Sequence, residues 1–169
     1  MIEILERNKC KLMDKIAIED FKIPGIVLST DIIVGFPTEN EEDFEKTLEL
    51  VKECKYDNAF TFIYSPRENT PAAKMKDDIP LSEKESRLYR LNEVVNTYFL
   101  ENNKKLLNKE VEVLVEGKSL KKDEEYFGYT DTNKLVNIKN GNDDIIGKIV
   151  KVKITDAKTW SLDGEYVSR

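Results

Sequence analysis

Before residue 108 the apolar residues form short continuous runs or recur at helical spacing. After residue 108 they alternate with polar residues. Residues 26–35 are largely apolar and β-branched and end at the turn Gly35-Phe36-Pro37, which is typical of a buried parallel strand. Residues 58–64 form a second run of this kind, and between the two runs apolar residues recur at helical spacing. That stripe consists of Phe44, Leu48 and Val51. The order strand, helix, strand with short links predicts a right-handed βαβ unit.

Two short patterns predict where the helices begin. Thr38 with Glu41, and Ser82 with the acidic Glu85, have the spacing of a capping box. The second pattern predicts the start of a long helix, whose helical spacing of apolar residues ends near Asn108. Its apolar stripe consists of Leu88, Leu91, Val95 and Phe99. Residues 1–22 are helix-like but weakly patterned.

After residue 108 the apolar residues alternate with polar ones. Residues 111–115 and 150–154 place valine or isoleucine at every second position, and turn-forming Gly, Asn and Asp separate such runs. About five short strands fit between residues 110 and 168, which is the size of a small barrel of the OB type. The sequence therefore predicts an α/β domain over residues 1–108, followed by a small all-β barrel over residues 109–169.

Charge and composition narrow the class of protein. The net charge is −6, and neither domain is basic, which weighs against autonomous RNA binding because neutralised phosphates supply most of such affinity. The chain contains no histidine, so histidine-based nucleophilic catalysis and histidine-ligated metal are excluded. We identify neither a signal peptide nor an apolar run long enough to cross a membrane, so we expect a cytoplasmic protein without a membrane partner.

The cysteines also limit what the chain can bind. Cys10 and Cys54 are the only two, they are far apart, and no CxxC motif exists. The chain therefore has no complete thiolate set for an iron–sulfur cluster, and we assign it neither metal ligands nor catalytic residues of its own.

Two positions in the first domain could take part in chemistry. Asp31 lies within an apolar strand, where a carboxylate is costly unless it is paired or faces a cleft. Arg67 follows the second strand and could clamp a carboxylate or phosphate, since ligands gather at the carboxyl ends of parallel strands. A structural hydrogen bond for Asp31 and a solvated loop arginine at position 67 are the alternatives, and the residues alone leave both open.

The second domain contains several aromatic residues, namely Tyr126, Phe127, Tyr129 and Trp160. Such residues can stack the bases of single-stranded nucleic acid, and Lys134 beside Asn133 could meet a phosphate or a base edge. Aromatic side chains are ordinary in the core of so small a barrel, and a single tryptophan is more often a core residue than a stacking platform, so the core interpretation is the strong alternative.

Taken together, four segments resemble one known family. STDIIVGFPTENEEDFEKTLELV and FIYSPRENTPAAKM are similar to the second half of the barrel of radical S-adenosylmethionine tRNA methylthiotransferases. GYTDTNKLVN and IGKIVKVKITDAKTWSLDGEYV resemble the family's C-terminal TRAM domain, an OB-like RNA-binding module. The resemblance runs from about Ile23 to Val167, and the branch acting on isopentenyladenosine is the most similar. Thr38 and Asn69 stand where the family commonly has glycine.

The resemblance implies a fold and an activity. The chain would comprise the C-terminal part of a TIM-like radical barrel, followed by a TRAM barrel. The family uses S-adenosylmethionine and iron–sulfur clusters to add a methylthio group at carbon 2 of an adenosine beside the tRNA anticodon. Its cluster cysteines would lie upstream of residue 1, so this chain by itself is expected to be inactive. Its expected partners are the anticodon arm of tRNA and the missing N-terminal half of the enzyme.

Matching the motifs residue by residue implies two sets of site residues. Asp31, Ile33, Tyr64, Ser65 and Arg67 would lie near S-adenosylmethionine. Asn133, Lys134 and Trp160 would contact RNA. Other interpretations remain: a stand-alone tRNA-binding module, a non-functional remnant, or a methylthiotransferase that acts on threonylcarbamoyladenosine.

Overall fold

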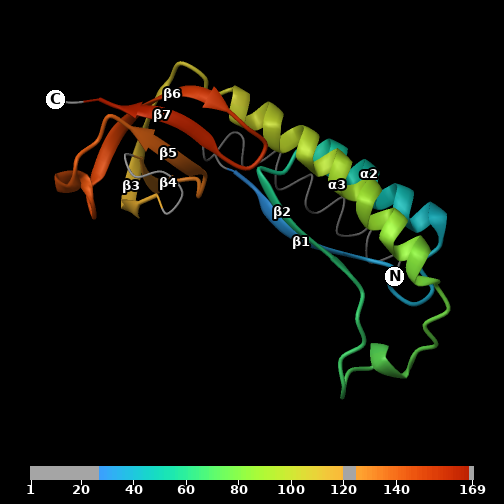
Figure 1. The fold of residues 1–169 in the computed structure, drawn as a ribbon. Coiled ribbons are helices and arrows are strands. Elements are labelled where there is room, and N and C mark those ends of the chain that lie inside the picture. Colours follow the sequence, from blue (N-terminus) through green and yellow to red (C-terminus); the bar gives the residue numbers. More distant parts are fainter. Residues whose placement is uncertain (1–26, 120–124, 168–169) are drawn as a thin grey trace, which may run out of the picture. The chain divides into compact units, whose positions relative to one another are not determined.

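The computed structural model describes residues 27–119 and 125–167, so the weakly patterned residues 1–22 lie outside the described residues (Figure 1). Contacts divide the chain into two compact units, Met1–Tyr98 and Phe99–Arg169. This division falls within the last helix of the first unit, ahead of residue 108, because the end of that helix packs with the barrel. Among the described residues, no helix is long and apolar enough to cross a membrane.

The first unit contains the expected βαβ arrangement. Strand β1 (Ser29–Val34) is followed by helix α2 (Glu41–Cys54) and by strand β2 (Asn58–Ile63), which pairs with β1 in parallel. The short 3₁₀ helix η1 (Ala72–Lys74) precedes the long helix α3 (Leu81–Lys104). The predicted apolar stripe of α2 is confirmed, because Phe44, Leu48 and Val51 are all buried.

Both helices lie on one side of the β1–β2 sheet (Figure 1). Strand residues therefore alternate between a helix-covered face and an open face. The helix-covered face includes Val34 and Ala59, both buried. The open face carries Ile33, Phe60 and Phe62, whose side chains remain 50–57% exposed. This face is apolar although it is uncovered within the described residues.

The predicted helix starts were wrong by one or two residues. Asn40, not Thr38, is the N-cap of α2, and it forms a capping box with Asp43. Thr38 instead lies in the preceding turn with a positive φ of 76°. Helix α3 begins at Leu81, so Ser82 lies in its first turn and Pro80 supplies the first accepting carbonyl. At α2 the two neighbouring polar residues Thr38 and Asn40 can both serve as the cap, whereas at α3 the carbonyl of Pro80, which has no polar side chain, accepts the first helical hydrogen bonds.

Thr38 gives a prediction about stability. A β-branched residue at positive φ is strained by roughly 1–3 kcal/mol, and glycine is not. We expect Thr38→Gly to raise the free energy of unfolding of the first unit by about 1 kcal/mol, although glycine usually destabilises. Urea unfolding followed by the helical circular dichroism signal measures the change. Thr97→Gly, at an exposed position inside α3, is the control and should lose roughly 0.3–0.5 kcal/mol, the difference between the helix propensities of threonine and glycine. Equal losses of unfolding free energy in both variants would contradict the proposed backbone strain at Thr38.

The second unit is a closed five-stranded barrel, as predicted. Its strands follow the spatial order β3-β4-β5-β7-β6, and β6 pairs again with β3 to close it. They span β3 (Glu110–Lys118), β4 (Tyr126–Thr130), β5 (Leu135–Lys139), β6 (Ile149–Ala157) and β7 (Leu162–Tyr166), with the 3₁₀ turn η2 (Asp143–Ile145) before β6.

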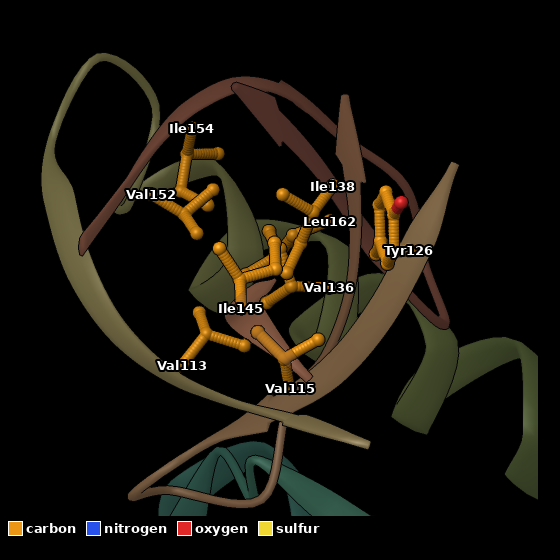
Figure 2. Close-up of a cluster of buried hydrophobic side chains, with 9 residues drawn as sticks. All are labelled: Val113, Val115, Tyr126, Val136, Ile138, Ile145, Val152, Ile154 and Leu162. Carbon is orange, nitrogen blue, oxygen red and sulfur yellow. The ribbon is translucent and has the colours of Figure 1, made fainter. Parts of the chain in front are cut away.

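The barrel interior holds one apolar cluster. Alternate residues of every strand point inward, as the period of two requires, and meet at the centre of the barrel (Figure 2). The cluster consists of Val113, Val115, Tyr126, Val136, Ile138, Ile145, Val152, Ile154 and Leu162. Tyr126 is thus core and not part of an exposed aromatic platform, and its hydroxyl donates to Asp143 over 2.6 Å.

Candidate cofactor site and nucleic-acid interface

Two of the expected cofactor-binding residues lie on the open face of the sheet. Asp31 is beside Phe60 and Ile33 is beside Phe62 in the parallel register. Asp31 is exposed, so its carboxylate is not buried against an apolar neighbour as the strand pattern suggested. The open face therefore combines one carboxylate with large apolar side chains near the carboxyl ends of two strands.

The other three expected residues follow the end of β2. The backbone amide of Tyr64 donates to the carbonyl of Val34 over 2.8 Å, which extends the pairing by one step. The Tyr64 ring meets Phe36 edge to face, with centroids 5.0 Å apart, and the Lys84 ammonium lies 5.6 Å from the Tyr64 ring centre. Ser65 is exposed beyond it.

Arg67 is also exposed, but its backbone is fixed. The carbonyl of Arg67 accepts hydrogen bonds from the hydroxyl and amide of Thr70, at 2.8 and 3.3 Å. This turn contains Asn69 at a φ of 66°, a conformation that asparagine tolerates better than most residues. The guanidinium is therefore presented from an ordered turn beyond the strand ends.

An ion network that the sequence did not reveal holds the turn after β1. The Glu39 carboxylate accepts from the Gly35 amide at 3.0 Å and from the Arg87 guanidinium at 2.8 Å. Arg87 also donates to the Glu39 carbonyl and pairs with Glu83. Its guanidinium is nearly fully buried, so the pairing is protected from water. Because Glu39 and Arg87 are 48 positions apart, no local pattern could have indicated the contact.

In the barrel, strand pairing brings the expected RNA-binding residues to one end. Strand β5 pairs with β7 in parallel, with Val136 opposite Leu162. Lys134 and Trp160 each precede this pair by two residues, so both lie where the two strands begin. Asn133 occupies the β4–β5 turn with a φ of 58°, and it is exposed.

The aromatic residues of the barrel have different environments. Trp160 is 64% exposed, so it is not a core residue. Phe127 and Tyr129 are half-buried on the outer side of β4. This outer surface of β4 and β5, with the loop between β6 and β7, corresponds to the place where OB folds bind oligonucleotides.

A polar network flanks that surface. Asp163 accepts from Asn137 at 2.8 Å and from Lys158 at 2.5 Å. Burial disfavours the charge on Asp163, but the hydrogen bonds from Lys158 and Asn137 outweigh it and lower the pKa of its carboxyl. The hydrogen bond between Lys158 and Asp163 in turn raises the pKa of the Lys158 ammonium. The pair is ionised at neutral pH and ties the start of β7 to the preceding loop.

Within residues 27–119 and 125–167, no three histidine, cysteine or acidic side chains gather closely enough to hold a metal ion. The Cys54 side chain is hydrogen-bonded to the Tyr56 hydroxyl. Burial, and then the hydrogen bond with Cys54, raise the pKa of the Tyr56 hydroxyl, so it stays protonated at neutral pH.

Comparison with known proteins agrees with the closed barrel of the second unit. Residues 104–167 match the model of the TRAM domain. Over 145 residues, which is 86% of this chain, the chain is 59% identical to the tRNA-2-methylthio-N(6)-dimethylallyladenosine synthase of Bacillus cytotoxicus (strain DSM 22905 / CIP 110041 / 391-98 / NVH 391-98). The chain is therefore similar to part of this synthase over most of its own length. Synthases of the same name from Bacillus mycoides (strain KBAB4) and Bacillus cereus (strain B4264) are each 58% identical over the same share.

The methylthiotransferase resemblance noted in the sequence is thereby confirmed, together with its TRAM domain. The chain spans only 28% of the length of each of these synthases.

Proposed function

We propose that this chain is the C-terminal part of a cytoplasmic tRNA methylthiotransferase. The enzyme would add a methylthio group at carbon 2 of isopentenyladenosine next to the anticodon. The observation that carries this proposal is the identity of 57–59% to synthases of that modification across 86% of the chain. The fold agrees, because a parallel βαβ unit is followed by the closed TRAM barrel in the expected order.

The open face of the first unit fits the adenosine part of S-adenosylmethionine. Ile33 and Phe62 offer exposed apolar surface beside each other, which suits contact with a purine ring. Asp31 on the same face could accept from ribose hydroxyls or an amino group, and Arg67 and Ser65 could bind a carboxylate. When bound, S-adenosylmethionine supplies the radical chemistry and the methyl group, while these residues would hold and orient it.

The residues of this chain do not fit an iron–sulfur cluster. Such clusters need three or four thiolates, and the sequence has two cysteines, of which Cys54 lies beside Tyr56 in the first unit. The cluster ligands of the proposed enzyme would therefore come from residues outside the segment that this chain matches in the longer relatives. We derive no catalytic step from this chain alone.

The TRAM barrel supports tRNA as the partner. It is closed, with its own core, so it can present a binding surface without further strands. Asn133, Lys134 and Trp160 would contact the anticodon arm at the end of the barrel where β5 and β7 begin. The acidic balance of the chain predicts weak binding with a modest dependence on salt.

A chimera tests the proposed function. Residues 23–167 replace the matching segment of the Bacillus cytotoxicus synthase, and the chimera is expressed in cells that lack this modification. We expect mass spectrometry of digested tRNA to detect 2-methylthio-isopentenyladenosine. A second chimera that ends at Lys104, before the TRAM barrel, should lose most of the product, because tRNA is no longer held.

Two results would contradict the proposal. One is a chimera that carries the same iron content as the parent synthase but forms no methylthio product. The other is methylthiolation of threonylcarbamoyladenosine in place of isopentenyladenosine, which would assign the chain to the other branch.

A further inference from the structure

The only tryptophan of the chain is displayed at the surface of the barrel. Trp160 keeps 64% of its surface exposed, although a tryptophan normally contributes large apolar area to a core. One side of it is supported: its ring meets Phe99 edge to face, with centroids 5.3 Å apart and planes at 72°. Phe99 is buried, so the indole packs against a side chain that is itself fixed in place.

Hydrogen bonds also fix the turn that contains Trp160. The Lys158 amide donates to the Ser161 carbonyl over 2.9 Å, which closes a tight turn around Thr159 and Trp160. The Asn103 side-chain amide, at the end of α3, donates to the carbonyls of Lys158 and Thr159, at 2.8 and 3.2 Å. Asn103 is only 5% exposed. Its two N–H groups therefore fix the two consecutive peptide groups that precede Trp160.

We propose that Trp160 is a stacking platform for one unpaired nucleobase, and that Asn103 is the residue that positions it. This inference rests on the proposed tRNA-binding function and deepens it. Stacking of a base on an aromatic ring is worth roughly 1–3 kcal/mol and is tolerant of sequence. A ring already held by Phe99 and Asn103 loses little conformational freedom when a base arrives, so more of that energy appears as affinity.

The surroundings of Trp160 favour a nucleobase over an apolar protein surface. The residues at this end of the barrel are polar: Asn133 is exposed, and Lys134, Thr159 and Ser161 offer donors and acceptors for base edges and phosphate. The exposed aliphatic side chain Ile149 lies at the start of β6, whereas Trp160 follows its end. Trp160 thus lies at the opposite end of β6 from this exposed aliphatic side chain.

Because Trp160 is the sole tryptophan, its fluorescence reports on this position alone. The full chain is titrated with a fluorescently labelled anticodon stem-loop RNA, and binding is followed by the anisotropy of the label and by the Trp160 emission. A fully paired RNA duplex of equal length serves as the comparison. We expect the stem-loop to quench Trp160 and the duplex to leave its emission nearly unchanged.

Substitutions separate stacking from folding. Trp160→Ala should weaken stem-loop binding roughly fivefold to hundredfold, and Trp160→Phe should recover part of that loss. Asn103→Ala should lower the fluorescence anisotropy of Trp160 and weaken stem-loop binding several-fold. Asn102→Ala is the matched control, since Asn102 is also buried at the end of α3. Its side-chain oxygen Oδ1 accepts from the Lys105 ammonium at 2.7 Å. This control should leave the mobility of Trp160 unchanged.

Four outcomes would overturn all or part of the inference. Stem-loop binding without any change in Trp160 emission would remove the stacking role and leave tRNA binding standing. An unchanged affinity in Trp160→Ala would show that no base stacks on the exposed indole. Equal effects of Asn103→Ala and Asn102→Ala on Trp160 mobility would remove the positioning role. A chain that binds no RNA at all would overturn both this inference and the tRNA-binding part of the proposed function.

Discussion

Hydrogen exchange on the full chain is expected to differ sharply between the two units. Backbone amides of β1 and β2 should exchange almost as fast as in an unstructured peptide, because these strands pair only with each other among the described residues. Their open face also exposes Ile33, Phe60 and Phe62. Residues 111–115 and 149–154 of the closed barrel should be protected roughly a thousandfold or more.

Self-association of the chain is a second readout of this expected difference. Exposed apolar area of this kind stabilises a protein by roughly 25 cal/mol per Å² once it is buried, so the first unit should self-associate or aggregate when the chain is alone. In the chimera with the upstream part of a relative, residues 29–34 should gain protection. A monomeric chain with slow exchange in both units would show that the first unit is complete without further strands.

Gly128→Ala is expected to unfold the barrel. A Cβ atom at this inward-facing position of β4 would lie 2.1 Å from the Leu114 carbonyl oxygen and 2.9 Å from a Val113 methyl group. Backbone atoms of a neighbouring strand cannot move aside without breaking the ladder. We therefore expect a loss of at least 3 kcal/mol, the upper end of the roughly 1–3 kcal/mol typical of overpacking, which exceeds the stability that so small a domain can spare.

Gly117→Ala provides the matched control on the neighbouring strand. A Cβ atom at Gly117 would lie 3.6 Å from the Phe127 ring, which is an ordinary contact. Thermal unfolding followed by circular dichroism should show a nearly normal transition for Gly117→Ala and none for Gly128→Ala. Transitions within about 1 kcal/mol of each other would mean that the barrel can adjust at Gly128, and that its packing is looser than the structure indicates.

The local patterns of the sequence determined the elements and their order. The spacing of Phe44, Leu48 and Val51 identified the buried side of α2, because a helix of 3.6 residues per turn places them on one stripe. The alternation around Val113 and Val152 predicted barrel strands with these side chains inside, because successive side chains of a strand point to opposite faces. The motifs in their order also identified the family.

Cap positions and side-chain environments could not be determined in this way. Thr38 and Asn40 are both good capping residues, and only the path of the turn after β1 decided between them. Tyr126 and Trp160 are both aromatic, yet Tyr126 points from β4 into the core, whereas Trp160 lies in the loop between β6 and β7 and is exposed. Strand pairing decides which face of β4 is inside, and the position of the β6–β7 loop decides the exposure of Trp160.

The tertiary structure alone decided which distant residues meet. The parallel pairing of β5 with β7 brings Lys134 and Trp160 to one end of the barrel. The packing of α3 places Arg87 against Glu39, and Asn103 beneath the turn that bears Trp160. These contacts join positions tens of residues apart, and their stability comes from burial and hydrogen bonds that exist only once the elements have packed. A local pattern extends over a few turns of helix or a few strand residues, so it cannot encode such pairs.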